Sequence, residues 1–274
     1  MSVTNLAKRR GKILDDMMRF HRGNLPKRMA EIPLEDLRAF ASLTPPATDL
    51  AALLRQPGTT LIASCQKASP VRGLLANHYN AVRRAQEFVK AGATAVAIHT
   101  DARHYQGQLE DLRDARETLP RQVPLIHRDF IFDPYQVYES RVAGADGIWL
   151  ITAVLGESDL RALIKLTQKL GMIPLVDVHT EEELGLATAV NAPVIVLNRR
   201  NWQTFAIHED RVAELRPHVP ETTLVIAAGG YDTANAIREA RPHNLHGILI
   251  GEALARSKTP DLLLREMVKA NHLP

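Results

Sequence analysis

The segment LVIAAGGYDTANAIREARPHNLHGILIGEALAR, residues 224–256, carries the pattern that decides the fold. An apolar run at 224–228 is followed by an amphipathic stretch at 231–240 and by a second apolar run at 247–251. Short runs rich in Val, Ile and Leu, bounded by glycine or polar residues, are typical of parallel strands buried on both faces. The segment therefore predicts a strand, a helix and a second strand, connected as a right-handed βαβ unit.

The same alternation extends over most of the chain, with eight apolar runs in all. The runs lie at 61–65, 93–98, 124–130, 147–151, 174–178, 194–198, 224–228 and 247–251. The clearest amphipathic stretches between them lie at 80–91, 132–143, 157–170, 181–189 and 231–240. Eight such units close naturally into a barrel, so we predict an α/β protein with a single (β/α)8 TIM barrel. A doubly wound open sheet is the alternative that the pattern alone leaves open.

Residues 1–55 do not follow this alternation of apolar runs and amphipathic stretches. They contain helical stretches near 4–22 and 33–42, punctuated by Asn24-Leu25-Pro26 and Thr44-Pro45-Pro46. We therefore expect an N-terminal helical extension, 1–55, packed on a barrel formed by 56–274. Glycines at 92 and 144 follow helical stretches and are expected to end those helices in the left-handed conformation.

Composition narrows the function classes. Hydrophobic residues make up 45% of the 274 residues and charged residues 24%, which is typical of a soluble globular protein. The net charge is only +3 and no Lys/Arg block is present, which argues against a nucleic-acid partner. No apolar run is long enough for a membrane span, and the N-terminus lacks a signal-peptide core, so we expect a cytoplasmic protein. A single cysteine, Cys65, rules out a disulfide within the chain and argues against a cysteine metal site.

The functional site of such a barrel lies at the carboxyl ends of the strands, where every second side chain points inward. This parity selects the candidates Ser64, Gln66, Arg128, Asp177, His179, Asn198 and Arg200. The same parity turns Cys65 and His127 toward the helices, and Trp149 and Trp202 are interpreted as packing residues.

Glycines after the last two strands predict a phosphate site. Ala228-Gly229-Gly230 leaves backbone N–H groups unobstructed, and Gly251-Glu252 leads directly into a short helical segment at 252–256. In barrels these two loops and a short helix form the usual phosphate site. The alternative is that the glycines only make tight turns.

Several motifs, in order, resemble the indole-3-glycerol phosphate synthase family. They are LIASCQKASPVRG (61–73), RDFIFDPYQVYESRVAGADGIWLI (128–151), LVDVHTEEEL (175–184), VLNRRNWQTF (196–205), GILIGEALAR (247–256) and, in the extension, ILDDMMRF (13–20). The resemblance runs from about residue 8 to the end of the chain. It implies ring closure of an anthranilate-bearing deoxyribulose phosphate with loss of carbon dioxide and water, a step of tryptophan biosynthesis, with no metal or organic cofactor.

The resemblance breaks at the reacting residues. Where the family has glutamate and lysine on its first strand, this chain has Ser64 and Gln66. Arg128 replaces the lysine that is the family's presumed general acid, and Asp177 replaces a glutamate. An arginine is a poor proton donor near neutral pH. The Glu-Ser that follows the family's seventh strand is Ala228-Gly229 here, whereas Ser69, Asn198, Arg200, Gly230, Gly251 and Glu252 match.

The resemblance and the departures together assign expected roles. Arg128, Asp177 and His179 are the catalytic candidates, and Gly229, Gly230, Gly251 and Glu252 the phosphate-binding ones. The substrate-binding candidates are Ser64, Gln66, Ser69, Tyr105, Asn198 and Arg200. Tyr105 lies in a loop, 100–108, that is more polar than the family's and is either a recognition loop or a solvated one.

Three functions stay open at this point. The first is an enzyme on a phosphorylated small molecule with altered lyase, isomerase or ring-closing chemistry. The second is genuine indole-3-glycerol phosphate synthase, and the third is a phosphate-ligand binding protein without catalysis. We expect a monomer or a homodimer, with no membrane or nucleic-acid partner.

Overall fold

Eight parallel strands close into a barrel in the computed structural model, which describes residues 3–272 and side chains from residue 13 onward. The strands are β1 (Thr60–Cys65), β4 (Ala95–His99), β5 (Leu125–Arg128), β6 (Gly147–Ile151), β7 (Ile173–Val178), β8 (Val194–Asn198), β9 (Leu224–Ala228) and β10 (Gly247–Ile250). Strand β1 pairs with both β4 and β10, which closes the sheet. The predicted TIM barrel is confirmed, and the open sheet is wrong.

Both faces of each strand are buried, which explains why the apolar runs do not alternate between apolar and polar residues. Side chains such as Val96, Leu150 and Ile250 point outward into the core beneath the helices. Ile62, Ile126 and others fill the barrel interior. Outward-facing and inward-facing side chains alternate along each strand, as predicted.

Helices cover the outside of the barrel. They are α4 (Ala81–Ala91), α5 (Leu109–Thr118), α6 (Pro134–Val142), α7 (Glu157–Lys169), α8 (Glu181–Ala189), α9 (Arg211–Leu215), α10 (Ala234–Ala240), α11 (Glu252–Arg256) and α12 (Pro260–His272). Their ends follow local chemistry: Thr180 and Glu183 form a capping box at α8. Gly92 and Gly144 have φ angles of +108° and +86°, so the expected left-handed helix ends are confirmed.

The N-terminal helix is longer than expected. Helix α1 runs from Val3 to Glu31 and continues through Pro26, where we expected an interruption. Leu25, beside the proline, is buried with Leu37 and Tyr135, and this packing holds the chain helical where local sequence favours a break. Helix α2 (Leu34–Leu43) then ends before the Thr44-Pro45-Pro46 segment, as predicted.

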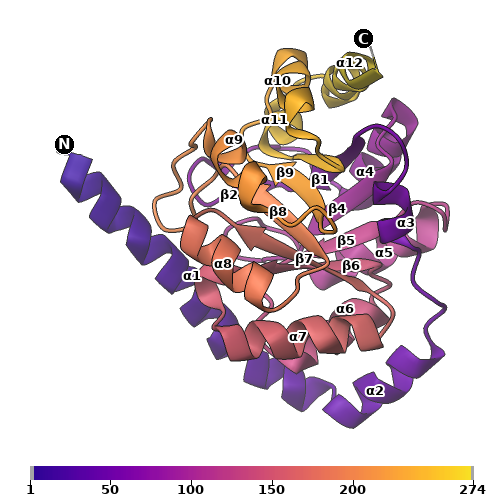
Figure 1. The fold of residues 1–274 in the computed structure, drawn as a ribbon. Helices are drawn as coiled ribbons and strands as arrows, with labels where there is room; N and C mark the ends of the chain where they lie inside the picture. The colour runs from indigo at the N-terminus through magenta and orange to yellow at the C-terminus, as the bar shows by residue number, and fades with distance from the viewer. Residues whose placement is uncertain (1–2, 273–274) are drawn as a thin grey trace.

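Elements of residues 1–55 pack at both ends of the barrel. Figure 1 shows α1 along one side of the molecule. Its Leu14 and Met18 border the residues after β6 and β8, so α1 crosses the carboxyl-end loops. At the opposite end, Leu54 of α3 (Leu50–Leu54) reaches the first residue of β10. A short hairpin of β2 (Ala68–Ser69) and β3 (Gly73–Leu74), which we did not predict, follows β1. None of the helices between residues 3 and 272 is long and apolar enough to cross a membrane.

Candidate functional site

A pocket opens at the carboxyl ends of the strands, where the sequence placed the site. The space inside it that a water-sized molecule can occupy is about 60 Å³, so the pocket is narrow. The predicted residues that line it are Gln66, Ser69, Tyr105, Arg128, Asn198, Arg200, Gly229, Gly230, Gly251 and Glu252. Ser64, Asp177 and His179 do not line it.

The glycine turns after β9 and β10 lie side by side. The two strands pair directly, so their carboxyl ends meet at one edge of the pocket. Gly229 and Gly230 have φ angles of +86° and +75°, which glycine adopts without strain. A Cβ on Gly229 would lie 2.7 Å from Oδ1 of Asn198. A Cβ on Gly251 would lie 2.9 Å from Oε1 of Gln66. The backbone therefore approaches its neighbours, and the pocket, more closely than any residue with a side chain would allow.

Glu252 ties two arginines together at the rim. Its Oε1 lies 2.6 Å from Nε of Arg72, and its Oε2 accepts a 3.0 Å bond from Arg200. Arg200 also donates to the backbone oxygen of Phe205. The carboxylate of Glu252 thus holds Arg200 over the pocket, and only the backbone of Glu252 remains to face an anion.

Arg128 has an uncommon environment at the inner end. It is 8% exposed, and its guanidinium lies 4.3 Å from the centre of the Trp149 ring. Within the described residues its one hydrogen bond is a 3.4 Å contact to Ser64, and its Nε has no partner. Burial lowers the pKa of Arg128, but a guanidinium still remains charged. The pocket therefore contains a buried cation without a paired carboxylate.

Asp177 is enclosed rather than presented. Its carboxylate accepts hydrogen bonds from Nε1 of Trp149 (2.8 Å), Nδ2 of Asn198 (2.8 Å) and Nε1 of Trp202 (3.0 Å). Burial raises its pKa to about 7, although these three donors favour the ionised form. Trp149 and Trp202, which we interpreted as packing residues, are buried. Their indole N–H groups also hold this carboxylate.

The other predicted polar residues act mainly on the backbone around the pocket. Asn198 links Asp177 to the next turn, because its Oδ1 accepts from the backbone N–H of Arg200 at 3.0 Å. The Ser69 hydroxyl accepts from the N–H of Arg72. His179 is bonded through Nδ1 to the backbone oxygen of Asn198 and lies beside His208, away from the pocket.

His99 is a pocket residue that sequence reasoning missed. It ends β4, lines the pocket, and stacks on Tyr105 with ring centres 3.8 Å apart and 10° between the planes. The inward parity that selected Arg128 on β5 also selects His99 on β4, since the two are partners in register. The inward-facing position of His99 at the end of the second apolar run is the sequence signal that identifies it.

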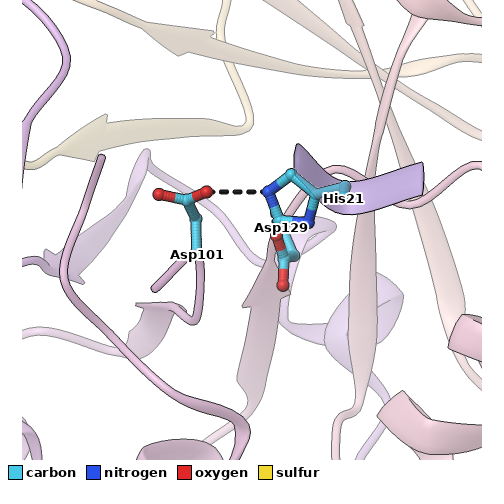
Figure 2. A group of neighbouring side chains, drawn as sticks. All are labelled: His21, Asp101 and Asp129. Carbon is cyan, nitrogen blue, oxygen red and sulfur yellow. Dashed lines mark hydrogen bonds and ion pairs between the residues drawn. The ribbon is translucent and has the colours of Figure 1, made fainter. Parts of the chain in front are cut away.

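A second polar cluster joins α1 to the ends of β4 and β5 (Figure 2). Nε2 of His21, from α1, is 2.7 Å from Oδ2 of Asp101 and 3.6 Å from Oδ1 of Asp129. These three residues form a group whose ligand atoms are close enough to share a metal ion. The other oxygen of each carboxylate is bonded to the protein: Oδ1 of Asp101 accepts from the N–H of Tyr105, and Oδ2 of Asp129 from the hydroxyl of Thr100. Although burial opposes it, the two carboxylates beside His21 favour its protonated form and raise its pKa.

Comparison with known proteins agrees with the geometry. The sequence profile of the family described as indole-3-glycerol phosphate synthase matches residues 14–267. The indole-3-glycerol phosphate synthase of Dehalococcoides mccartyi strain CBDB1 is 36% identical over 258 residues, covering 93% of this chain and 100% of the relative. The protein of that name from Mycobacterium tuberculosis strain CDC 1551 is 35% identical over 263 residues and covers 96% of each chain. Among solved structures, 3-hexulose-6-phosphate synthase from Salmonella typhimurium superposes with a TM-score of 0.63 at 13% identity, over 77% of this chain and 98% of that one, a likeness in fold alone.

Proposed function

We propose, since the chain belongs to the indole-3-glycerol phosphate synthase family, that it is an enzyme acting on a phosphorylated small molecule by a lyase, isomerase or ring-closing reaction that differs from the family's named one. The phosphate binds the backbone of Gly229, Gly230 and Gly251, with Arg200 beside it. The other end of the substrate lies against Arg128.

The observation that carries the proposal is the distribution of charge along the pocket. The rim keeps the family's glycines and Arg200, whereas the inner end offers a buried guanidinium that forms no ion pair with a carboxylate among the described residues. The Trp149 indole contacts both Arg128 and the buried carboxyl of Asp177, and Asp129 lines the small space beside Arg128. A pocket with cations at both ends suits a substrate with two separated anionic groups.

Asp177 is in this scheme a positioning residue. It holds Trp149 and Asn198, and these in turn set Arg128 and the turn at Arg200. The family's lysine acid has no replacement able to release a proton easily, because an arginine pKa lies above about 12. Chemistry that needs charge stabilisation more than proton donation fits this arrangement.

A second candidate is the family's named reaction itself. The identity of about 35% over nearly the whole length of both chains favours it. It requires that Arg128, Asp177 and the residues at Ser64 and Gln66 support ring closure despite their altered side chains.

One assay separates the two candidates. Purified protein is incubated with the anthranilate-bearing deoxyribulose phosphate, and indole-3-glycerol phosphate is followed by its indole fluorescence. We expect no product above a buffer blank. Formation of product at a rate that saturates with substrate would establish the second candidate and overturn the first.

The Arg128→Ala variant provides the matched test of the proposed chemistry. Metabolites that co-purify with the protein are identified by mass spectrometry, and their conversion is measured. Loss of a transition-state charge contact is expected to lower turnover by about a hundredfold or more. Unchanged conversion of every such metabolite by R128A would contradict the proposed role of the inner cation.

A further inference from the structure

Exposed apolar side chains gather on one part of the surface. Of the seven large hydrophobic side chains that are exposed among the described residues, four lie between the end of α1 and the end of α2: Met29, Ile32, Phe40 and Leu43. Leu43 is 80% exposed and Phe40 50%. Single apolar residues are normal on a protein surface, whereas a concentration of them marks a surface that binds a partner. Figure 1 shows α2 at the outer edge of the molecule.

Phe40 and Leu43 border an open groove that has mainly apolar walls. The groove continues over α5 and over the end of α6, where Val142, Ala143 and Gly144 line it. The space in it that water-sized molecules can occupy is about 430 Å³. These helices lead into β5 and β6, so the groove lies at the amino ends of the strands, whereas the pocket lies at their carboxyl ends. A partner bound there leaves the pocket accessible.

Opposite charges lie at the two ends of this apolar surface. Asp36 is one turn before Phe40, and positions 36, 40 and 43 share one side of α2. Arg113 lines the groove together with Leu43. Asp36 and Arg113 are both exposed, and neither forms an ion pair with a described residue. Each therefore has a free charge to offer a partner.

The basic end lies beyond the last residue of α2. Arg121 lines the groove and donates a 3.0 Å hydrogen bond to the backbone oxygen of Pro45, which follows α2. Arg116 also lines the groove, but its charge is paired with the buried carboxylate of Asp146. The remaining arginines outnumber the one acid of the groove, Glu117. The apolar surface thus runs from an acidic end to a basic one.

We propose that this surface binds a second copy of the chain, forming a dimer in which the two α2 helices run antiparallel across a two-fold axis. In such an interface the same surface of both copies is used. Phe40 and Leu43 then pack against their counterparts, and the half-turn that relates the copies brings Asp36 of each to Arg113 of the other. Two equivalent ion pairs form at the ends of the apolar contact. This inference is independent of the reaction in the pocket.

The dimer is expected to be weak. Stable interfaces bury about 800 Å² of each partner, and they depend on a few well-packed apolar residues at the centre. Here the centre consists of two side chains from each copy, with charges at the rim. We therefore expect a dissociation constant on the order of 10 µM.

Sedimentation velocity tests the apolar centre of the interface. Wild-type protein is measured from about 1 µM to about 100 µM, a range that brackets the expected constant, and should change from monomer to dimer across it. Leu43→Glu places a carboxylate at the centre and is expected to weaken association at least tenfold. Leu262→Glu is the matched control, because Leu262 is 53% exposed on α12 and lies outside the groove. It should associate as wild type does, and circular dichroism confirms that both variants fold.

A charge-reversal pair tests the antiparallel arrangement. Asp36→Arg or Arg113→Glu, each alone, brings like charges together at both ends and is expected to weaken association about tenfold. In an equal mixture of the two variants, unlike copies restore both ion pairs. The mixture should therefore associate more strongly than either variant does by itself. Only a surface that pairs with itself in this orientation gives that result.

Three outcomes would overturn the inference. They are wild-type protein that stays monomeric over the whole range, a dimer that L43E leaves intact, and a mixture of D36R and R113E that associates no better than its components. None of them bears on the pocket, so the proposed function would stand. Failure of the proposed function would likewise leave the dimer unaffected.

Discussion

A single methylene separates Asp177 from the glutamate that the family has at this position, and the consequence is visible in its surroundings. The shorter carboxylate does not reach the pocket, and it is enclosed by the indole N–H groups of Trp149 and Trp202 and by the amide of Asn198. At the residue scale, aspartate in place of glutamate keeps the negative charge but changes which groups the carboxylate can reach.

Removing that carboxylate should destabilise the protein. Asp177→Ala leaves three buried N–H groups without an acceptor, and unsatisfied buried donors cost roughly 1–3 kcal/mol each. Partial rearrangement offsets some of this cost, so we expect the free energy of unfolding in urea to fall by about 3 kcal/mol. Asp232→Ala, at an exposed site of the rim, is the matched control with an expected change near zero. A D177A protein as stable as wild type would contradict the enclosing role.

At the scale of elements, helix α1 is fastened to the loops that form the pocket. His21 bonds to Asp101, whose other oxygen fixes the loop carrying Tyr105, and it lies close to Asp129, which follows Arg128 (Figure 2). An imidazolium between two carboxylates therefore connects α1 to the ends of β4 and β5.

This connection should weaken as pH rises. Burial lowers the pKa of His21, but the hydrogen bond to Asp101 and the charges of Asp129 and Asp101 outweigh it, so the folded-state pKa is raised above 6.5. A raised folded-state pKa means that the stabilisation is fully present below the unfolded pKa and is lost as pH rises through the folded one.

The measurement compares wild type with His21→Gln between pH 5.5 and 9. The difference in free energy of unfolding is expected to be largest at the acidic end and to shrink steadily toward pH 9. The difference between the two proteins in the rate of protease cleavage between residues 13 and 31 should likewise be largest at the acidic end. A difference that does not vary with pH would exclude a charged His21 as the fastening group.

At the scale of the whole molecule, closure of the barrel brings the end of β1 against the phosphate site. Strand β10 pairs with β9 on one side and with β1 on the other, so turns far apart in sequence meet at the same rim. Gly251 depends on this closure, because a Cβ there would lie 2.9 Å from Oε1 of Gln66, after β1. Gly229 instead lies against Asn198 and Arg200, which the direct pairing of β8 with β9 brings to it. Ligand binding at this rim is therefore coupled to folding of the entire barrel.

Inorganic phosphate should stabilise the protein against heat. A ligand that binds only the folded state adds about 2.7 kcal/mol when present at a hundred times its Kd, which corresponds to a rise in Tm of about 5 °C for a domain of this size. Scanning calorimetry over a phosphate series, with chloride at matched ionic strength, measures the rise. Gly229→Ala strains the turn and should abolish the phosphate-dependent part, whatever its effect on the starting Tm. An equal rise in both proteins would place the anion elsewhere.

Much of the fold could be read from local pattern. The eight apolar runs, the helix ends at Gly92 and Gly144, and the inward side of Arg128 and Asn198 follow from periodicities of two and 3.6 residues and from the freedom of glycine at positive φ. These properties depend on neighbours along the chain, so they are visible before the chain folds. The continuation of α1 through Pro26 was missed because packing on Leu25 overrides the local signal.

The arrangement of the site depended on contacts between distant segments. The indoles around Asp177 come from β6 and from the turn after β8, and the partner of Asp101 comes from a helix 80 residues earlier. The pairing of His99 with Arg128 requires the register between two strands. Sequence alone determined the alternation of strands and helices and the inward parity of most pocket side chains. Only the tertiary structure decided which of them meet, because distances between strands, and the burial that shifts a pKa or leaves a donor unpaired, exist only once the barrel has closed.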